Sequence, residues 1–211
     1  MTLKEFDVKY IDSLKSTFFK LEEVHNDVLK EYKFDLNETE ISDAILERLK
    51  TYYVTQNHIK MFLGKHYVTA AADFFVETTL FYLNLYLDSQ NNGLKAFSEK
   101  KIKAARNSIR PDISVWRNDE VIAIIECKTQ LGWNRNNWEQ DYNNRDSILK
   151  ADFPNAKSFL LVMTGENWGG FGEHHYLDSN FFCLLKNTWP FSYSGSEQIF
   201  TPIENLFKQL K

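Results

Sequence analysis

The most informative segment of the chain is Arg110-Pro-Asp-Ile-Ser-Val-Trp-Arg-Asn-Asp-Glu-Val-Ile-Ala-Ile-Ile-Glu-Cys-Lys-Thr-Gln130. Its apolar run, residues 121–125, is rich in β-branched side chains and predicts a strand buried on both faces. Because side chains alternate across a strand, one face is expected to carry Ile122, Ile124, Glu126, Lys128 and Gln130. A carboxylate and an ammonium would then project together from a hydrophobic strand, where charges are costly unless they pair or bind a ligand.

Asp112 adds a second carboxylate shortly before this strand. Asp112 and Glu126 would supply the hard oxygen ligands that Mg²⁺ prefers, together with waters and phosphate oxygens. A bound Mg²⁺ lowers the pKa of water and neutralises charge on a scissile phosphate. Lys128 could orient the attacking water or stabilise the transition state. These residue types therefore suit phosphodiester cleavage, and the alternative is a structural Glu–Lys pair at a strand end.

The spacing of these residues also resembles a known signature. Pro111-Asp112, a gap of thirteen residues and then Glu126-Cys127-Lys128 is similar to the motif of the PD-(D/E)xK nuclease superfamily, which includes most type II restriction endonucleases. The resemblance implies that Asp112, Glu126 and Lys128 are catalytic. It also implies a Mg²⁺ cofactor, for which Mn²⁺ can substitute, with the Cys127 carbonyl as a further ligand. Many restriction enzymes carry an extra acid on an upstream helix, and by this resemblance Glu77 is the candidate here. The alternatives are an acid that faces solvent and an acid that pairs with a basic residue elsewhere.

The pairing register offers a test, because opposed residues in an antiparallel pair point to the same face. A two-residue turn at Asn118-Asp119 would place Asp112 opposite Ile125, on the wrong face from Glu126. A three-residue loop that includes Glu120 would place Asp112 opposite Glu126. We therefore expect the three-residue loop, or a bulge that has the same effect.

Composition limits where nucleic acid could bind. The 211-residue chain has a formal net charge of −4, so any positive surface for DNA must be local. The strongest basic run, residues 95–110, directly precedes the motif, and a solvated helix face is the alternative explanation for it. An asparagine-rich stretch follows the motif and could contact bases, whereas its tryptophans could equally be core anchors. The candidate DNA-binding residues are Lys100, Lys101, Lys103, Arg106, Arg110, Asn134 and Arg135. Gln130, on the same face as Glu126 and Lys128, could hold a water or a phosphate beside them.

Hydrophobic periodicity outlines the rest of the fold. We expect a helix over residues 3–32, a second over 37–53, a connector over 57–64, an apolar helix over 67–87 and a closing helix over 196–211. Further strands are expected at 157–164 and 181–185. This order predicts an α/β fold with a mixed β-sheet flanked by helices and an N-terminal helical region at 1–64. It agrees with the restriction-endonuclease-like core that the resemblance implies, placed at 65–211. The resemblance covers roughly residues 67–185.

The resulting functional hypothesis is a Mg²⁺-dependent DNA endonuclease that hydrolyses double-stranded DNA. A type II restriction enzyme acting as a homodimer is favoured, because palindromic sites match two-fold protein symmetry. The alternatives are a DNA repair or junction-resolving nuclease and a nuclease-like module that binds without cutting. Two cysteines, no apolar leader and no run long enough to span a membrane make the cytoplasm the expected location and argue against a membrane partner.

Overall fold

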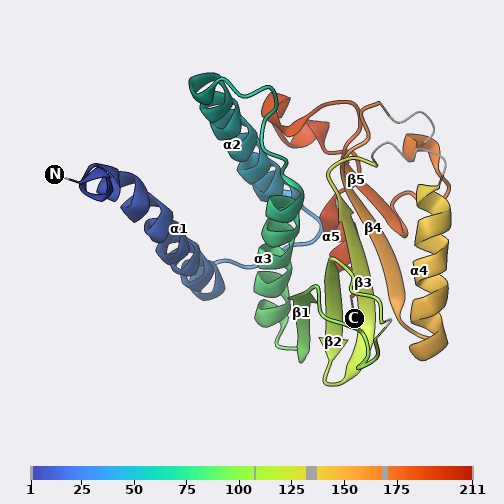
Figure 1. Cartoon of the computed structure of the whole chain (residues 1–211). Helices are drawn as coiled ribbons and strands as arrows, with labels where there is room; N and C mark the ends of the chain where they lie inside the picture. Colours follow the sequence, from blue (N-terminus) through green and yellow to red (C-terminus); the bar gives the residue numbers. More distant parts are fainter. Residues whose placement is uncertain (1, 107, 132–136, 168–170, 211) are drawn as a thin grey trace.

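The computed structural model describes residues 2–106, 108–131, 137–167 and 171–210 and shows an α/β protein built on a mixed five-stranded sheet (Figure 1). The helices are α1 (Leu3–Glu31), α2 (Glu40–Leu63), α3 (Ala72–Gln90), α4 (Trp138–Asp152) and α5 (Ile203–Phe207). The strands are β1 (Leu94–Ser98), β2 (Ile113–Arg117), β3 (Glu120–Lys128), β4 (Lys157–Thr164) and β5 (Phe181–Leu185), and they lie side by side in that order. The pairs β1–β2 and β2–β3 are antiparallel, whereas β3–β4 and β4–β5 are parallel. The predicted fold class is confirmed.

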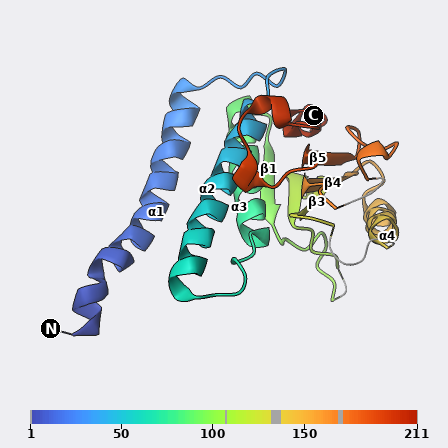
Figure 2. The ribbon, with the colours of Figure 1, turned by 90° about the horizontal axis from the view of Figure 1, so that it is seen from above.

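Helices cover the sheet on both sides. The side covered by α3, here called the α3 face, carries one large apolar cluster in which strand residues such as Ile125 and Leu161 meet Phe75 of α3, Ile45 of α2 and Phe207 of α5. Of the α-helices in the described residues, α4 covers the opposite side, here called the α4 face (Figures 1 and 2). The α4 face thus leaves more of the sheet available for polar groups than the α3 face does.

A buried carboxylate links the start of α2 to α5, the last helix of the chain. Glu204 of α5 accepts hydrogen bonds from the backbone N–H groups of Ile41 and Ser42 at 2.7 and 2.9 Å and from the Ser42 hydroxyl at 2.5 Å. These donors lie in the first turn of α2, where unpaired N–H groups and the helix dipole favour an anion. Glu204 therefore fixes the start of α2 against the last helix of the chain.

Helix α1 differs from the other long helices, because none of its described residues is buried. It begins with a capping box formed by Thr2 and Glu5, and its C-terminal half approaches α3, where His25 lies beside Asp88 and Phe81. Its N-terminal half projects from the body of the protein (Figure 2). Among the described residues, no helix is both long and apolar enough to cross a membrane.

Several predicted boundaries were wrong. The expected connector at 57–64 is helical, because α2 continues to Leu63 and ends only where Gly64 adopts the left-handed conformation that caps a helix, with φ of 63°. The expected closing helix over 196–211 is a 3-10 turn followed by the short α5. Pro202 separates them, since proline favours an extended residue before it and can start a helix after it. The basic run does not form a helix face: it comprises most of β1 and the loop that follows.

Candidate active site

A β-bulge brings the two motif carboxylates to the same face of the sheet. The β2–β3 turn has two residues, since Arg117 pairs with Glu120, and the expected three-residue loop was therefore wrong. The register then shifts, because Trp116 pairs with Val121 but Val115 pairs with Ala123. Ile122 is the extra residue. The pairing of Ile113 with Ile125, continued by one residue, sets Asp112 opposite Glu126, which is the effect that was expected of a bulge.

The bulge also corrects one expectation about the faces of β3. Ile122 packs against the cluster on the α3 face, whereas Val121 joins Ile124 on the α4 face. The simple alternation that placed Ile122 on the same face as Glu126 was wrong, because the extra residue inverts the alternation before it. The arrangement of Ile124 and Glu126 is unaffected.

Asp112, Glu126 and Lys128 form one ion-pair cluster on the α4 face. The Lys128 Nζ lies 3.0 Å from Asp112 Oδ2 and 3.3 Å from Glu126 Oε2. The backbone N–H of Cys127 donates to the same Asp112 oxygen at 2.8 Å, which fixes the orientation of that carboxylate. The Glu126 side chain is only 7% exposed, whereas that of Lys128 is 43% exposed. The cluster therefore has a buried acid at its base and a lysine that solvent reaches.

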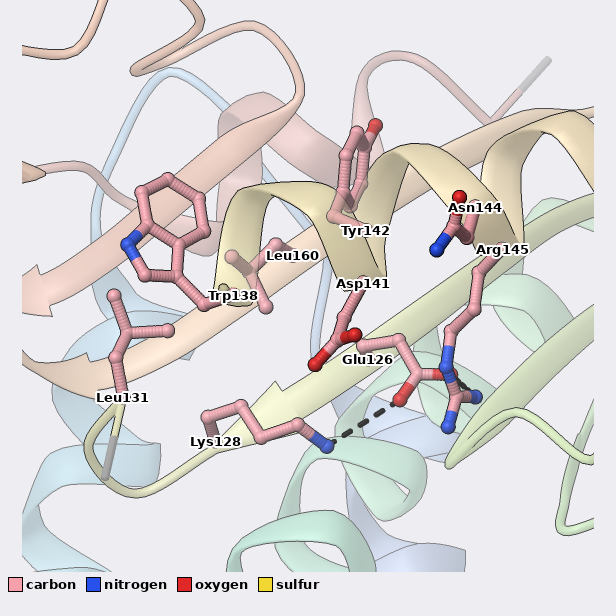
Figure 3. A pocket seen from close by; sticks show the side chains of 9 residues that line it. All are labelled: Glu126, Lys128, Leu131, Trp138, Asp141, Tyr142, Asn144, Arg145 and Leu160. Atoms are coloured by element: carbon pink, nitrogen blue, oxygen red, sulfur yellow. Dashed lines mark hydrogen bonds and ion pairs between the residues drawn. The ribbon is translucent and has the colours of Figure 1, made fainter. Parts of the chain in front are cut away.

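A fourth charged residue, Arg145 of α4, completes the cluster. Its Nη1 donates to Glu126 Oε1 at 2.5 Å, on the carboxylate oxygen that Lys128 does not contact (Figure 3). The helical spacing around Arg145 in the sequence indicates that this residue faces inward. Trp138, Tyr142, Arg145 and Leu149 recur at the spacing of a helix face that packs inward, and a charged residue within such a stripe indicates a buried partner.

The pKa values of the cluster follow from burial and from these pairings. Burial raises the pKa of Glu126 and the charge of Asp112 adds to this, while Arg145 and Lys128 oppose it. Burial acts to lower the pKa of Lys128, but the charges of Asp112 and Glu126 outweigh it and raise the pKa overall. Lys128 is therefore a charged hydrogen-bond donor near neutral pH, and it is poorly suited to act as a general base.

A cavity of about 460 Å³ opens beside the cluster, between α4 and the sheet (Figure 3). Glu126 and Lys128 of β3 lie along one side, and the helix contributes Asp141, Asn144 and Arg145 on the other. Its remaining wall is apolar and consists of Leu131, Trp138, Tyr142 and Leu160. The Tyr142 hydroxyl donates to the Ser158 carbonyl of β4 at 2.7 Å, which ties this part of α4 to the sheet. The charged cluster is thus accessible from a hollow large enough for a small ligand.

The donor set of the cluster fits Mg²⁺. Two carboxylates converge on a single amine, and Mg²⁺ is commonly held by one or two carboxylates with waters. The Cys127 carbonyl is directed toward the same side, because the N–H and C=O of one strand residue point the same way and the Cys127 N–H points to Asp112. In the described parts of the chain, no group of three or more His, Cys, Asp or Glu residues could hold a metal, so a site of the zinc type is not indicated there.

The other candidate site residues are not all brought to the cluster. Glu77 is exposed on α3, whose buried side chains pack on the opposite face of the sheet, and it is not among the residues that line the cavity. The Gln130 amide donates to the Glu166 carbonyl at 2.9 Å and so connects the end of β3 to the segment after β4. Asn134 and Arg135 lie outside the described residues. Trp138 packs against Phe171 and Phe181, which supports the core-anchor interpretation of this tryptophan.

The basic candidates lie in the loop between β1 and β2. Lys100 stacks over the Trp116 ring at 3.7 Å and Lys103 pairs with Asp152 at 2.6 Å, whereas Arg106 and Arg110 are exposed. Lys101 donates to the Ala105 carbonyl at 3.3 Å. The loop returns to the cluster, because the backbone N–H of Glu99 donates to the Asp112 carbonyl at 3.3 Å. A positive segment therefore leads directly to the candidate site.

Comparison with known proteins gives one match. Residues 7–161 match the family described as "Type I restriction enzyme R protein N terminus". No curated protein matches the chain. The matched range contains the whole charged cluster and most of α1, and it includes the helices before residue 67 that the motif resemblance did not cover.

Proposed function

This chain belongs to the family of type I restriction enzyme R protein N-terminal regions, and we propose that it is the nuclease of a restriction system, hydrolysing double-stranded DNA with Mg²⁺. The observation that carries the proposal is the convergence of Asp112, Glu126 and Lys128 in one ion-pair cluster, of which Glu126 and Lys128 line the cavity. The motif resembles that of a superfamily which includes most type II restriction endonucleases, whereas the family match favours the R protein of a type I system. The homodimer stays a prediction.

Asp112 and Glu126 would hold the ion, with the Cys127 carbonyl beside them. A bound Mg²⁺ would supply charge neutralisation at the phosphate and would lower the pKa of water. Lys128 carries a raised pKa, so it would act as a cation that orients the attacking water and donates to the phosphate. A water oxygen would bond to phosphorus as one phosphate ester bond breaks. One of the two water protons would be released to solvent, and the other would end on the leaving oxygen, which departs as an alcohol.

DNA would approach along the loop between β1 and β2. Arg106 and Arg110 are exposed on this loop, and the loop contacts Asp112 through its backbone. Phosphate contacts from such residues provide affinity that does not depend on sequence. A local positive segment is therefore compatible with a chain whose net charge is negative.

A second candidate is a structural ion-pair network in a module that does not cut. It is favoured by one observation: both carboxylate oxygens of Glu126 already contact cations, Lys128 on one side and Arg145 on the other. In that case Lys128→Ala should destabilise the fold strongly, because it would leave charged partners uncompensated.

Incubation of supercoiled and linear DNA with Mg²⁺ or Mn²⁺ separates the two candidates. The nuclease predicts cleavage by the wild type and its loss in Asp112→Ala and Lys128→Ala, with both variants still folding. Absence of cleavage of either DNA with either metal, together with a large loss of stability in Lys128→Ala, would establish the structural network instead.

A further inference from the structure

Arg145 is held where it can exchange one anionic partner for another. The α4 backbone around it is fixed, because Tyr142 is hydrogen-bonded to β4 and Leu149 is fully buried. The guanidinium itself lies at the cavity, and its side chain is 41% exposed. Within the described residues Glu126 is its one hydrogen-bonding partner, through Nη1. A guanidinium carries several further N–H donors, so Arg145 retains donors for a ligand in the cavity.

The charge of the cluster indicates what that ligand is. Asp112 and Glu126 balance Lys128 and Arg145, so the four side chains together are neutral. A divalent cation on the carboxylates would leave the cluster with two positive charges. The transition state of phosphodiester hydrolysis is a dianion at the reacting phosphate, which such a cluster would neutralise. Without Arg145 the match would be one positive charge short.

We propose that Arg145 is a catalytic residue that releases Glu126 and binds a non-bridging oxygen of the scissile phosphate. The inference rests on the proposed nuclease function and assigns the substrate contact of that same site. The exchange keeps the donors satisfied, because carboxylate and phosphate present similar paired oxygens to the planar guanidinium. Lys128 and Arg145 then lie on either side of Glu126 and contact the phosphate from two directions.

Metal binding distinguishes this phosphate contact from a role in which Arg145 only holds Glu126 in place. If Arg145 served only to orient and stabilise the carboxylate, its removal would weaken metal binding, and high metal concentrations would restore cleavage. If Arg145 binds phosphate, its removal takes a positive charge away from the cation site, so metal binding is unchanged or tighter while cleavage stays slow at saturating metal.

The test compares wild type with Arg145→Ala, Arg145→Lys and the matched control Lys150→Ala. Lys150 is exposed on the same helix and pairs with Asp146 at 2.9 Å, so its loss removes a positive charge from α4 away from the cavity. The measurements are Mn²⁺ binding to the DNA-free protein by calorimetry, affinity for duplex DNA in Ca²⁺, and single-turnover cleavage at saturating Mg²⁺.

We expect Arg145→Ala to lose roughly 10²–10³-fold in cleavage rate, as for removal of one preorganised donor. It should also bind DNA more weakly in Ca²⁺, without any loss of Mn²⁺ affinity. Arg145→Lys should recover part of both losses, and Lys150→Ala should behave as wild type.

Weakened Mn²⁺ binding with cleavage restored at high Mg²⁺ would overturn the assignment, as would unchanged cleavage. Should the wild type cut no DNA, the nuclease function fails but this contact is still decided by affinity: equal DNA binding by wild type and Arg145→Ala refutes it, and a selective loss in Arg145→Ala supports it.

Discussion

The two faces of the sheet are built in different ways. On the α3 face, side chains from three helices and all five strands merge into one continuous apolar cluster. On the α4 face the apolar residues fall into two separate clusters, and the charged residues occupy the gap between them. Along α4, Arg145 stands between Tyr142 of one cluster and Leu149 of the other. Glu126 of β3 likewise stands in the sequence between Ile124 of β3 and Leu131, which follows the end of that strand. The comparison teaches that stability is concentrated on one face, which leaves the other free to bury charge.

The largest expected effect is the loss of cleavage in Asp112→Asn. This variant keeps the size of the side chain but removes the charge that would hold Mg²⁺, so we expect at least a roughly 10²–10³-fold lower cleavage rate. Unfolding by urea should change little, because the substitution lies in the charged gap rather than in an apolar cluster. Normal cleavage would show that Asp112 does not hold the metal, and a collapse of stability would show that the gap is part of the structural core.

The next prediction compares two neighbouring residues of β4 whose side chains lie on opposite faces of the sheet. Leu161 is fully buried in the α3-face cluster, whereas Leu160 lines the cavity on the α4 face. Leu161→Ala should lower the free energy of unfolding by roughly 2–5 kcal/mol, because it creates a new cavity. Leu160→Ala should cost about 2 kcal/mol or less, since it only enlarges an existing hollow. Urea denaturation measures both changes, and an equal loss of unfolding free energy in the two variants would contradict the difference between the two faces.

Alkaline pH should destabilise both faces. Burial raises the pKa of Cys183, in an α4-face cluster, from 9.0 to about 12, and it raises the pKa of Tyr53, in the α3-face cluster, to about 12. Both groups are neutral when protonated and their folded pKa is raised. Their stabilisation is therefore full below the unfolded pKa and is lost as pH rises toward the folded one.

Between pH 9 and 12 the Cys183 contribution should fall by up to about 1.4 kcal/mol per pH unit. Urea unfolding at a series of pH values measures this slope, and Cys183→Ala should flatten it. A Cys183→Ala slope identical to that of the wild type would mean that the thiol is not shielded as the structure shows.

The smallest effect concerns the exposed loop beside the α4 face. Arg106→Ala should weaken DNA binding moderately and should reduce the slope of log affinity against log salt by about 1, which corresponds to one lost phosphate contact. Lys15 lies on α1 and pairs with Asp12, so Lys15→Ala is the control that removes the same charge elsewhere. Fluorescence anisotropy at several salt concentrations distinguishes the variants, and equal slopes would place DNA away from this loop.

The sequence predicted what depends on local pattern. The apolar run before Glu126 correctly indicated a buried strand, and the motif spacing together with the expected bulge correctly set Asp112 opposite Glu126. The position of the bulge was not predicted, because Ile122 differs in no local property from Ile124. The end of α2 was missed since it depends on the left-handed conformation of Gly64.

Contacts between distant segments were also beyond local reasoning. Arg145 reaches Glu126 only because α4 docks on β4, and Glu204 caps α2 across most of the chain length. Glu77 was suggested by the resemblance and not by its local sequence; it is exposed on α3, and residues such as Phe75 occupy the buried side of that helix.

Because Ile122 is an extra residue in the β2–β3 hairpin, the number of residues between Asp112 and Glu126 decides whether the two acids share a face of the sheet. Thirteen residues lie between Asp112 and Glu126. Inserting or deleting one residue would make this number even and would place the two acids on opposite faces of the sheet. Inserting two would lengthen the hairpin and keep both acids on the same side. Natural relatives of this protein should therefore vary this interval in steps of two, or else gain and lose a bulge together with the odd residue.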